Sequence, residues 1–155
     1  MPHSPTIYAS AVLIGAKAVL IRGPSGAGKS SLAWALIKAA RPGGLLTFAR
    51  LVADDRALVE AKAGRLLVRP AAKLVGLIEI RGLGIRRTTY EKAAVVGLVV
   101  DLAVPDAARL PAPEAESTVI SGISLPRLAV APGADALPLV LAVLKTEPGT
   151  GTAAN

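Results

Sequence analysis

The octapeptide GPSGAGKS at residues 23–30 constrains this chain most, because it fits the pattern G-x-x-x-x-G-K-[ST] at every fixed position. The apolar stretch AVLIR precedes it and the amphipathic run SLAWALIKAA follows it, which predicts a strand, a glycine-rich loop and a helix in that order. Glycines at positions 23, 26 and 28 remove Cβ atoms that would keep an anion away from the backbone N–H groups. An ordinary glycine-rich turn is the alternative, and the flanking strand and helix favour a phosphate-binding loop.

Each part of this motif has an expected role in holding a nucleotide. The helix that opens near Lys29 offers its unpaired N-terminal amides to a phosphate group. Lys29 itself would supply a positive charge to the β- and γ-phosphates of ATP, and the Ser30 hydroxyl would hold Mg²⁺. The predicted nucleotide-binding residues are Gly23, Pro24, Ser25, Gly26, Ala27, Gly28, Lys29, Ser30 and Ser31.

The composition of the 155-residue chain narrows the fold and the partners. We expect one domain over residues 1–146, with an aliphatic core because only one Phe, one Trp and two Tyr occur, and a disordered tail over 147–155. The formal charge of +7 is spread along the chain, so nucleic-acid binding is not favoured. The absence of cysteine, of a signal peptide and of a long apolar run favours the cytoplasm and no membrane span.

Hydrophobic patterning predicts a mixed α/β sheet with few helices. The pattern indicates helices over 29–40 and 138–145 and a mobile, proline-rich connector over 103–116. His3, the single histidine, falls in an N-terminus where we expect no role for it. The predicted strands cover residues 8–14, 18–21, 51–53, 57–61, 65–69, 77–80 and 93–102, with two short ones near 119 and over 128–130.

Acidic residues that end or interrupt apolar strands are the second chemical signal. Asp54 and Asp55 follow the strand LVA, and two adjacent carboxylates allow one to address a metal while the other takes a proton from a hydroxyl. Asp101 follows LVV in the same manner and remains an alternative metal carboxylate. Glu79 lies inside an apolar strand, so we expect a partner for its charge, either Mg²⁺ or Arg81.

Three segments in this order, VLIRGPSGAGKSSLA, LVADDR and IEIRGLGI, resemble the catalytic domain of the HPr kinase/phosphorylases. These bacterial enzymes use ATP to phosphorylate a serine of the phosphotransfer protein HPr, in the regulation of carbohydrate metabolism, and can reverse the reaction by phosphorolysis. The resemblance covers about residues 8–102, and its third segment, IEIRGLGI, is nearly specific to this family. It is similar to the short proteobacterial form, which lacks the N-terminal domain of the family.

The resemblance implies a fold, an assembly and a set of roles. The fold would be a P-loop kinase of the phosphoenolpyruvate-carboxykinase-like type, and the assembly a hexamer. Mg²⁺ would be held by Ser30 and Glu79, with Asp54 supporting the metal shell, and Asp55 would accept the proton. Arg109, which stands before a leucine in the connector, would be the catalytic arginine of the family.

Two departures from the family pattern affect the reverse reaction. Tyr8-Ala9-Ser10 stands where the family has a histidine in a HAS-type sequence, and residues 131–134, APGA, stand where it has a basic RPGR-type loop. An imidazole can carry charge near neutral pH and a phenol does not, so we expect kinase activity with weak phosphorolysis.

Two other function classes remain open at this stage. A small-metabolite kinase would use a mobile arginine lid, for which Arg81, Arg86 and Arg87 are available. A non-catalytic nucleotide-binding switch is the third reading, although the chain contains no guanine-reading N-K-x-D segment.

Overall fold

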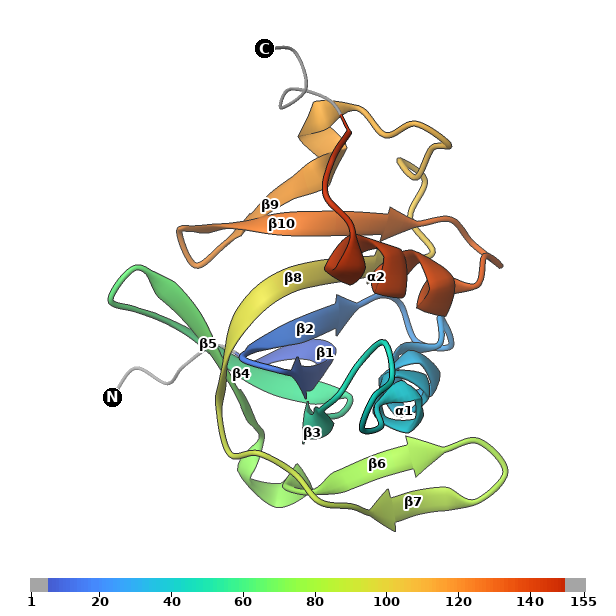
Figure 1. Cartoon of the computed structure of the whole chain (residues 1–155). Coiled ribbons are helices and arrows are strands. Elements are labelled where there is room, and N and C mark those ends of the chain that lie inside the picture. Colours follow the sequence, from blue (N-terminus) through green and yellow to red (C-terminus); the bar gives the residue numbers. More distant parts are fainter. Residues whose placement is uncertain (1–5, 150–155) are drawn as a thin grey trace.

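The computed structural model describes residues 6–149, which form a mixed α/β fold with few helices (Figure 1). His3 and residues 150–155 of the predicted tail lie outside the described residues. The strands are β1 (Thr6–Ile14), β2 (Lys17–Arg22), β3 (Ala49–Ala53), β4 (Arg56–Lys62), β5 (Arg65–Pro70), β6 (Leu77–Ile80), β7 (Gly84–Arg87), β8 (Ala94–Leu102), β9 (Ser117–Ile120) and β10 (Ile123–Val130). The helices are α1 (Lys29–Ala39) and α2 (Ala136–Lys145), with 3-10 turns η1 (Ala72–Leu74) and η2 (Pro113–Glu116).

Five strands of the larger sheet close into a ring. β2 pairs antiparallel with β1 and parallel with β8, and the chain of pairs from β1 through β4 and β5 returns to β8. β3 adds to β1, and β10 adds parallel to β8 and carries β9. β6 and β7 form a separate two-stranded ribbon below the sheet (Figure 1). The predicted mixed sheet is therefore confirmed. Within the ring, β1 pairs with both β2 and β4, and β8 pairs with both β2 and β5.

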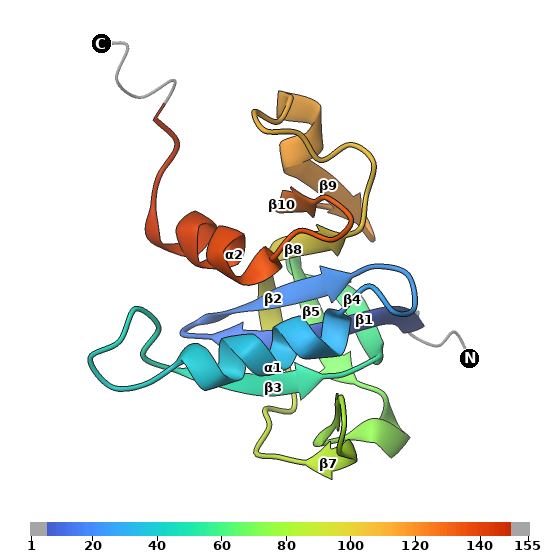
Figure 2. The ribbon, with the colours of Figure 1, turned by 90° about the vertical axis from the view of Figure 1, so that its right-hand side faces the viewer.

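Two aliphatic cores hold the strands together. One core, which includes Ala9, Ala11 and Leu20, is lined largely by small side chains, which let the strands of the ring approach closely. The other lies between the sheet and the two helices, where α1 buries Leu32 and Leu36 (Figure 2). This is the stripe that the spacing in the sequence predicts for α1, and it fixes the helix beside the end of β2.

Three local predictions need correction. The sequence does not predict β7, because residues 81–87 are all exposed and their two apolar side chains, Leu83 and Ile85, are separated by glycine and followed by two arginines. The connector expected to be mobile is anchored, since Arg127 on β10 donates to Asp106 and to the Ala115 carbonyl at 2.8 and 3.0 Å. Helix α2 begins two residues earlier than residue 138, because Asp135 caps it by accepting from the Leu137 N–H at 3.2 Å.

Candidate active site

The glycine loop, residues 23–28, joins β2 to α1 as the motif predicts. Gly26 and Gly28 have φ angles of 84° and 100°, in the left-handed region that disfavours other residues. Gly23 is required for space instead, because a Cβ there would lie 3.1 Å from the Leu102 Cβ and 3.2 Å from the Ala27 Cβ. The helix starts directly from Gly28, whose carbonyl accepts from the Leu32 N–H at 2.9 Å.

Lys29 and Ser30, the first two residues of α1, turn toward different neighbours. The Lys29 ammonium donates to the Gly23 and Pro24 carbonyls at 2.8 and 3.3 Å, and the residue is 9% exposed. The Ser30 hydroxyl lies 2.7 and 2.9 Å from the two carboxylate oxygens of Asp54. The loop is therefore closed by its own lysine and attached at its end to the strand β3.

Asp54 is the junction of the site. Its buried carboxylate accepts hydrogen bonds from the Ser10 hydroxyl at 2.6 Å, from Ser30, and from the Glu79 backbone N–H at 3.0 Å. These partners belong to β1, α1 and β6. A buried carboxylate needs such donors, and here they bring three distant segments to one point.

Asp55 differs from its neighbour in exposure and backbone. It is exposed and has a φ of 67°, a left-handed conformation that is uncommon for a residue with a side chain. Its carbonyl accepts from the Ala9 N–H at 3.1 Å, and its N–H donates to Ser10 Oγ at 3.4 Å. The tight turn between β3 and β4 thus directs one carboxylate inward and leaves the other free.

Two of the hollows that border Asp55 adjoin each other at the glycine loop. The first, of about 130 Å³, is lined by the glycine loop, the start of α1, Asp55, Glu79 and Arg81. The second is larger, about 310 Å³, and is lined by Tyr8, Gly23, Pro24, Ser25, Lys29 and Asp55. Ser25, Lys29 and Asp55 line both, so a group bound at the loop and a group bound beside Tyr8 would face the same carboxylate.

Glu79 is placed differently from the expectation for an acid in an apolar strand. Ile78 on one side of β6 is buried and packs toward α1, while Glu79 points to the other side and is exposed. Its carboxylate therefore needs no partner, and no salt bridge to Arg81 occurs among the described residues. It faces the first hollow as a free oxygen ligand.

Asp101 is neutralised and is not free to hold a metal. Arg22 donates to its two oxygens at 2.7 and 2.8 Å, and Arg127 donates at 2.6 Å. Burial raises the pKa of Asp101, but the hydrogen bonds and charges of the two arginines outweigh burial and hold it below its ordinary value. The hydrogen bonds between Asp106 and Arg127 likewise lower the pKa of Asp106 and raise that of Arg127. This pairing favours Asp54 and Asp55 over Asp101 as the carboxylates that serve a metal.

Tyr8 lines the second hollow and is in contact with Arg56. Tyr8 and Arg56 are directly paired across β1 and β4. The Arg56 guanidinium donates to Tyr8 Oη at 3.1 Å, and its central carbon lies 4.6 Å from the centre of the ring. Both residues are exposed.

The remaining residues singled out in the sequence lie outside this cluster. Arg109 is exposed in the connector and lines neither hollow at Asp55. Arg86 and Arg87 are exposed on β7, and residues 131–134 form an exposed turn before α2. The structure brings together Lys29, Ser30, Asp54, Asp55 and Glu79, but not Arg109.

Comparison with known proteins decides the family. The family model described as HPr Serine kinase C-terminal domain matches residues 3–134. The chain belongs to this family. In the search of solved structures, the HPr(Ser) kinase/phosphatase of Coxiella burnetii matches with a TM-score of 0.70 and 25% identity, over 90% of this chain and 88% of that one.

Curated relatives agree with this assignment over shorter segments. The HPr kinase/phosphorylase of Streptococcus thermophilus is 50% identical over 68 residues, which are 43% of this chain and 19% of that protein. The HPr kinase/phosphorylase of Geobacillus thermodenitrificans is 36% identical over 141 residues, 82% of this chain and 43% of the relative. The chain thus spans less than half of the length of these curated relatives. No described helix is long and apolar enough to cross a membrane.

The oxygen atoms that line the first hollow in this chain fit a magnesium ion. Ser30 and Glu79 offer oxygen atoms, which are the ligands that Mg²⁺ prefers. The oxygens of Asp54 already accept three hydrogen bonds, which suits the carboxylate to orienting Ser30 more than to direct ligation. Mg²⁺ usually binds one or two protein groups and keeps several waters. Ser30 and Glu79 are consistent with this, and residues 6–149 contain no cluster of three His, Cys, Asp or Glu side chains that could hold a metal ion.

Sequence reasoning missed two residues of the site, Ser10 and Arg56. Ser10 is a fully buried hydroxyl inside the apolar strand β1, and a lone polar residue in such a run was the available signal. Arg56 directly follows the two aspartates, but its position on Tyr8 depends on the β1–β4 register, which the sequence does not show.

Proposed function

We propose that this chain is an ATP-dependent protein kinase that phosphorylates a serine of an HPr-type phosphotransfer protein and so regulates carbohydrate metabolism. Residues 1–146 would form one catalytic domain of the phosphoenolpyruvate-carboxykinase-like P-loop type, acting in the cytoplasm as a hexamer. The observation that carries the proposal is that the glycine loop, Ser30, Glu79 and the exposed Asp55 line one hollow. Asp54 ties Ser30 and the Glu79 backbone together behind it.

The nucleotide would lie along the glycine loop with its phosphates toward the start of α1. The free amides of the loop and the helix terminus favour the negative charge there. The Lys29 ammonium donates to two loop carbonyls, and it would exchange these for phosphate oxygens when ATP binds. Asp54 keeps the Ser30 hydroxyl in place during this exchange, because the two side chains are hydrogen-bonded.

Phosphoryl transfer would take place beside Asp55. Asp55 accepts the proton of the acceptor serine hydroxyl while that oxygen forms a bond to the γ-phosphorus. The bond from the γ-phosphorus to the β,γ-bridging oxygen breaks, and ADP leaves with the electron pair. The exposed, backbone-strained position of Asp55 suits a base that must reach a hydroxyl on another protein.

Ser30 and Glu79 would hold Mg²⁺, with Asp54 orienting the serine. When bound, the ion neutralises negative charge on the phosphate oxygens. Arg109 would contribute as a catalytic arginine from the connector, which Arg127 fixes at Asp106.

A transfer assay tests the proposal. Radiolabelled γ-phosphate of ATP is followed to an HPr-type protein and to a panel of small hydroxyl compounds, with the Asp55→Asn variant as control. We expect label on a serine of the protein acceptor and loss of it in the variant. Label confined to small hydroxyl compounds would identify a small-metabolite kinase, and tight ATP binding without transfer to either would identify a nucleotide-binding switch.

A further inference from the structure

Another hollow lies apart from the proposed reaction site. Its volume is about 460 Å³, larger than either hollow at Asp55 described above, and it shares no lining residue with them. This volume is within the usual range of small-molecule sites, roughly 300–1,000 Å³. Strands β8 and β10 contribute Leu98 and Leu128 to it, and helix α2 contributes Val143.

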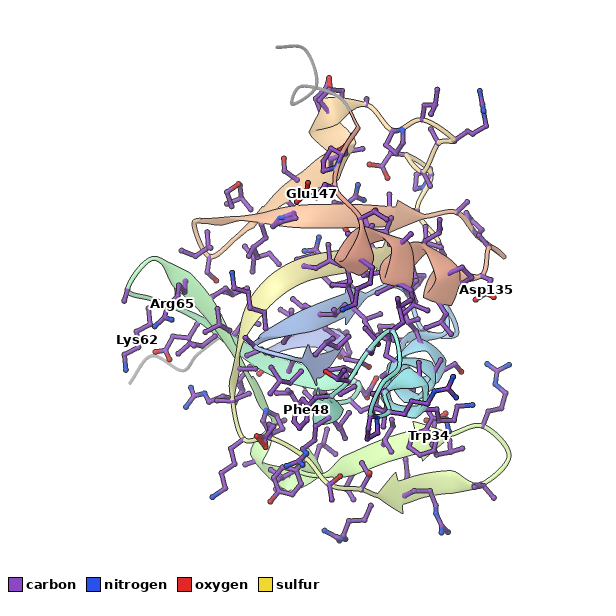
Figure 3. All side chains as sticks on the ribbon, viewed as in Figure 1. Trp34, Phe48, Lys62, Arg65, Asp135 and Glu147 are labelled. Atoms are coloured by element: carbon purple, nitrogen blue, oxygen red, sulfur yellow. The ribbon has the colours of Figure 1, made fainter. Side chains whose placement is uncertain are left out.

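Two further segments face each other across this hollow. One is the end of the connector with η2, which contributes Ala115 and Glu116, and the other follows α2 and contributes Thr146 and Glu147. Figure 2 shows the segment after α2 rising opposite η2 and β9. Glu147 is labelled on that segment, beside β10, in Figure 3. Each wall therefore brings one carboxylate to the hollow.

Hydrogen bonds hold both walls in place. Arg127, whose side chain is 11% exposed, donates to the Ala115 carbonyl at 3.0 Å and to Asp106 at 2.8 and 3.1 Å. On the other wall, the Thr146 hydroxyl donates to the Ala142 carbonyl in the last turn of α2 at 2.6 Å. A preformed hollow of this kind loses less conformational freedom when a ligand binds.

The hollow is acidic, although the chain as a whole has a formal charge of +7. Arg127 is the one cation among the described residues that line it, and the network of two arginines and two aspartates to which Arg127 belongs is neutral. Glu116 and Glu147 are exposed, and neither forms a salt bridge within residues 6–149. The two carboxylates disfavour a phosphate or carboxylate ligand and favour a cation.

The rest of the lining determines what kind of cation fits. It is largely aliphatic and contains no aromatic ring among the described residues, so a cation would be held by carboxylates and not by stacking. Val143 is 42% exposed and offers apolar surface that a ligand could cover. A methylene chain with an ammonium group at each end combines the two features that this surface matches.

We propose that this hollow binds an aliphatic diamine, with its methylene groups on the apolar lining and its ammonium groups at Glu116 and Glu147. The site is independent of the proposed kinase reaction, because neither the glycine loop nor the pair Asp54 and Asp55 lines it. Since the connector forms one wall, a bound diamine would also hold the connector against the segment that follows α2.

Cadaverine is the probe, with pentylamine and pentanediol as comparisons of the same length. Each is titrated calorimetrically at low ionic strength into the full chain, with Mg²⁺ and a non-hydrolysable ATP analogue present to occupy the acidic reaction site. We expect cadaverine to bind at least about threefold more tightly than pentylamine, because it can meet both carboxylates. Pentanediol should bind more weakly than either amine.

Matched variants locate the binding. Glu116→Gln and Glu147→Gln should each weaken cadaverine binding about threefold, whereas Glu114→Gln, an exposed acid of the same turn η2 that does not line the hollow, should leave it unchanged. Val143→Ser should weaken it about twofold. Leu139→Ser is the control for this change, since Leu139 is also 42% exposed on α2 but does not line the hollow.

The outcomes separate this site from the reaction site. Equal cadaverine affinity in wild type, Glu116→Gln and Glu147→Gln would overturn the proposal, and so would binding that is lost in Asp55→Asn, because the amine would then occupy the reaction site. If cadaverine binding disappears as the protein concentration rises, a second copy of the chain covers the hollow and the proposal fails. Cadaverine binding that depends on both glutamates, in a chain that transfers no phosphoryl group, would keep this site and remove the kinase proposal.

Discussion

Two strands of this molecule end in carboxylates beside the glycine loop, and the two sets of carboxylates have different hydrogen-bond partners. At the end of β3, Asp54 accepts from two hydroxyls and an amide, and Asp55 remains free. At the end of β8, Asp101 lies between Arg22 and Arg127. Neutral donors orient a carboxylate and leave its charge available to a cation, whereas two guanidinium groups neutralise that charge. The partners of an acid, more than its place after a strand, decide whether it can serve chemistry.

The glycine loop is attached to both strand ends. Arg22 precedes the loop and is bonded to Asp101, and Ser30 follows it and is bonded to Asp54. We therefore regard the β8 end as a structural anchor of the loop and the β3 end as its chemical side. Four predictions test this division, from the largest expected effect to the smallest.

The first prediction concerns the loop itself. Lys29→Ala removes the cation next to the phosphates and should lower phosphoryl transfer about a thousandfold and weaken ATP binding. Transfer assays and calorimetry measure the two effects. Lys38→Ala, on the exposed last turn of the same helix, is the control and should behave as wild type. Unchanged turnover and ATP affinity in Lys29→Ala would contradict the assignment of the loop.

The second prediction compares the same Asp→Asn substitution at the two strand ends. Asp55→Asn keeps the shape of the side chain but removes the base, so transfer should fall about a hundredfold or more while Mg-ATP still binds. Asp101→Asn should leave transfer near the wild-type rate once the protein is folded. If the two variants show the reverse pattern, the base lies at the end of β8.

The third prediction addresses the metal. Glu79→Gln should raise the Mg²⁺ concentration needed for half-maximal transfer about tenfold, because it removes an anionic ligand. Glu60→Gln is the control, since Glu60 is an exposed acid on β4 that pairs weakly with Arg69 at 3.7 Å. An unchanged Mg²⁺ requirement in Glu79→Gln would remove Glu79 from the metal site.

The fourth prediction concerns stability and pH at the β8 end. The pKa of Asp101 is lower in the folded protein than its ordinary value of about 4. Its stabilising effect is therefore present above about pH 4 and is lost as the pH falls through the folded-state pKa. Asp101→Asn should cost about 1 kcal/mol of unfolding free energy at pH 7 and less at pH 3, measured by urea unfolding. A cost that does not change with pH would contradict the ion-pair explanation.

The sequence predicts much of this site because its motifs are local. The loop, the first turn of α1 and the β3 end each lie within a few residues, so glycine spacing and an apolar run followed by two acids are sufficient signals. The exposure of Glu79 could not be foreseen in the same way, because among residues 6–149 β6 pairs only with β7, whose residues are all exposed. The neutralisation of the Asp101 charge could not be foreseen either, because its partner Arg127 is 26 positions away on a parallel strand.

The hydrogen bonds of Asp54 also have a consequence for the order of folding. Its partners Ser10, Ser30 and Glu79 are separated from it by 44, 24 and 25 positions in the chain. Contacts of such separation form late, after hairpins such as β1–β2 and β4–β5 and after helix α1, whose contacts are local. A refolding chain would thus regain its helical signal first. Its ability to bind a nucleotide would return only when the four segments have met at this one carboxylate.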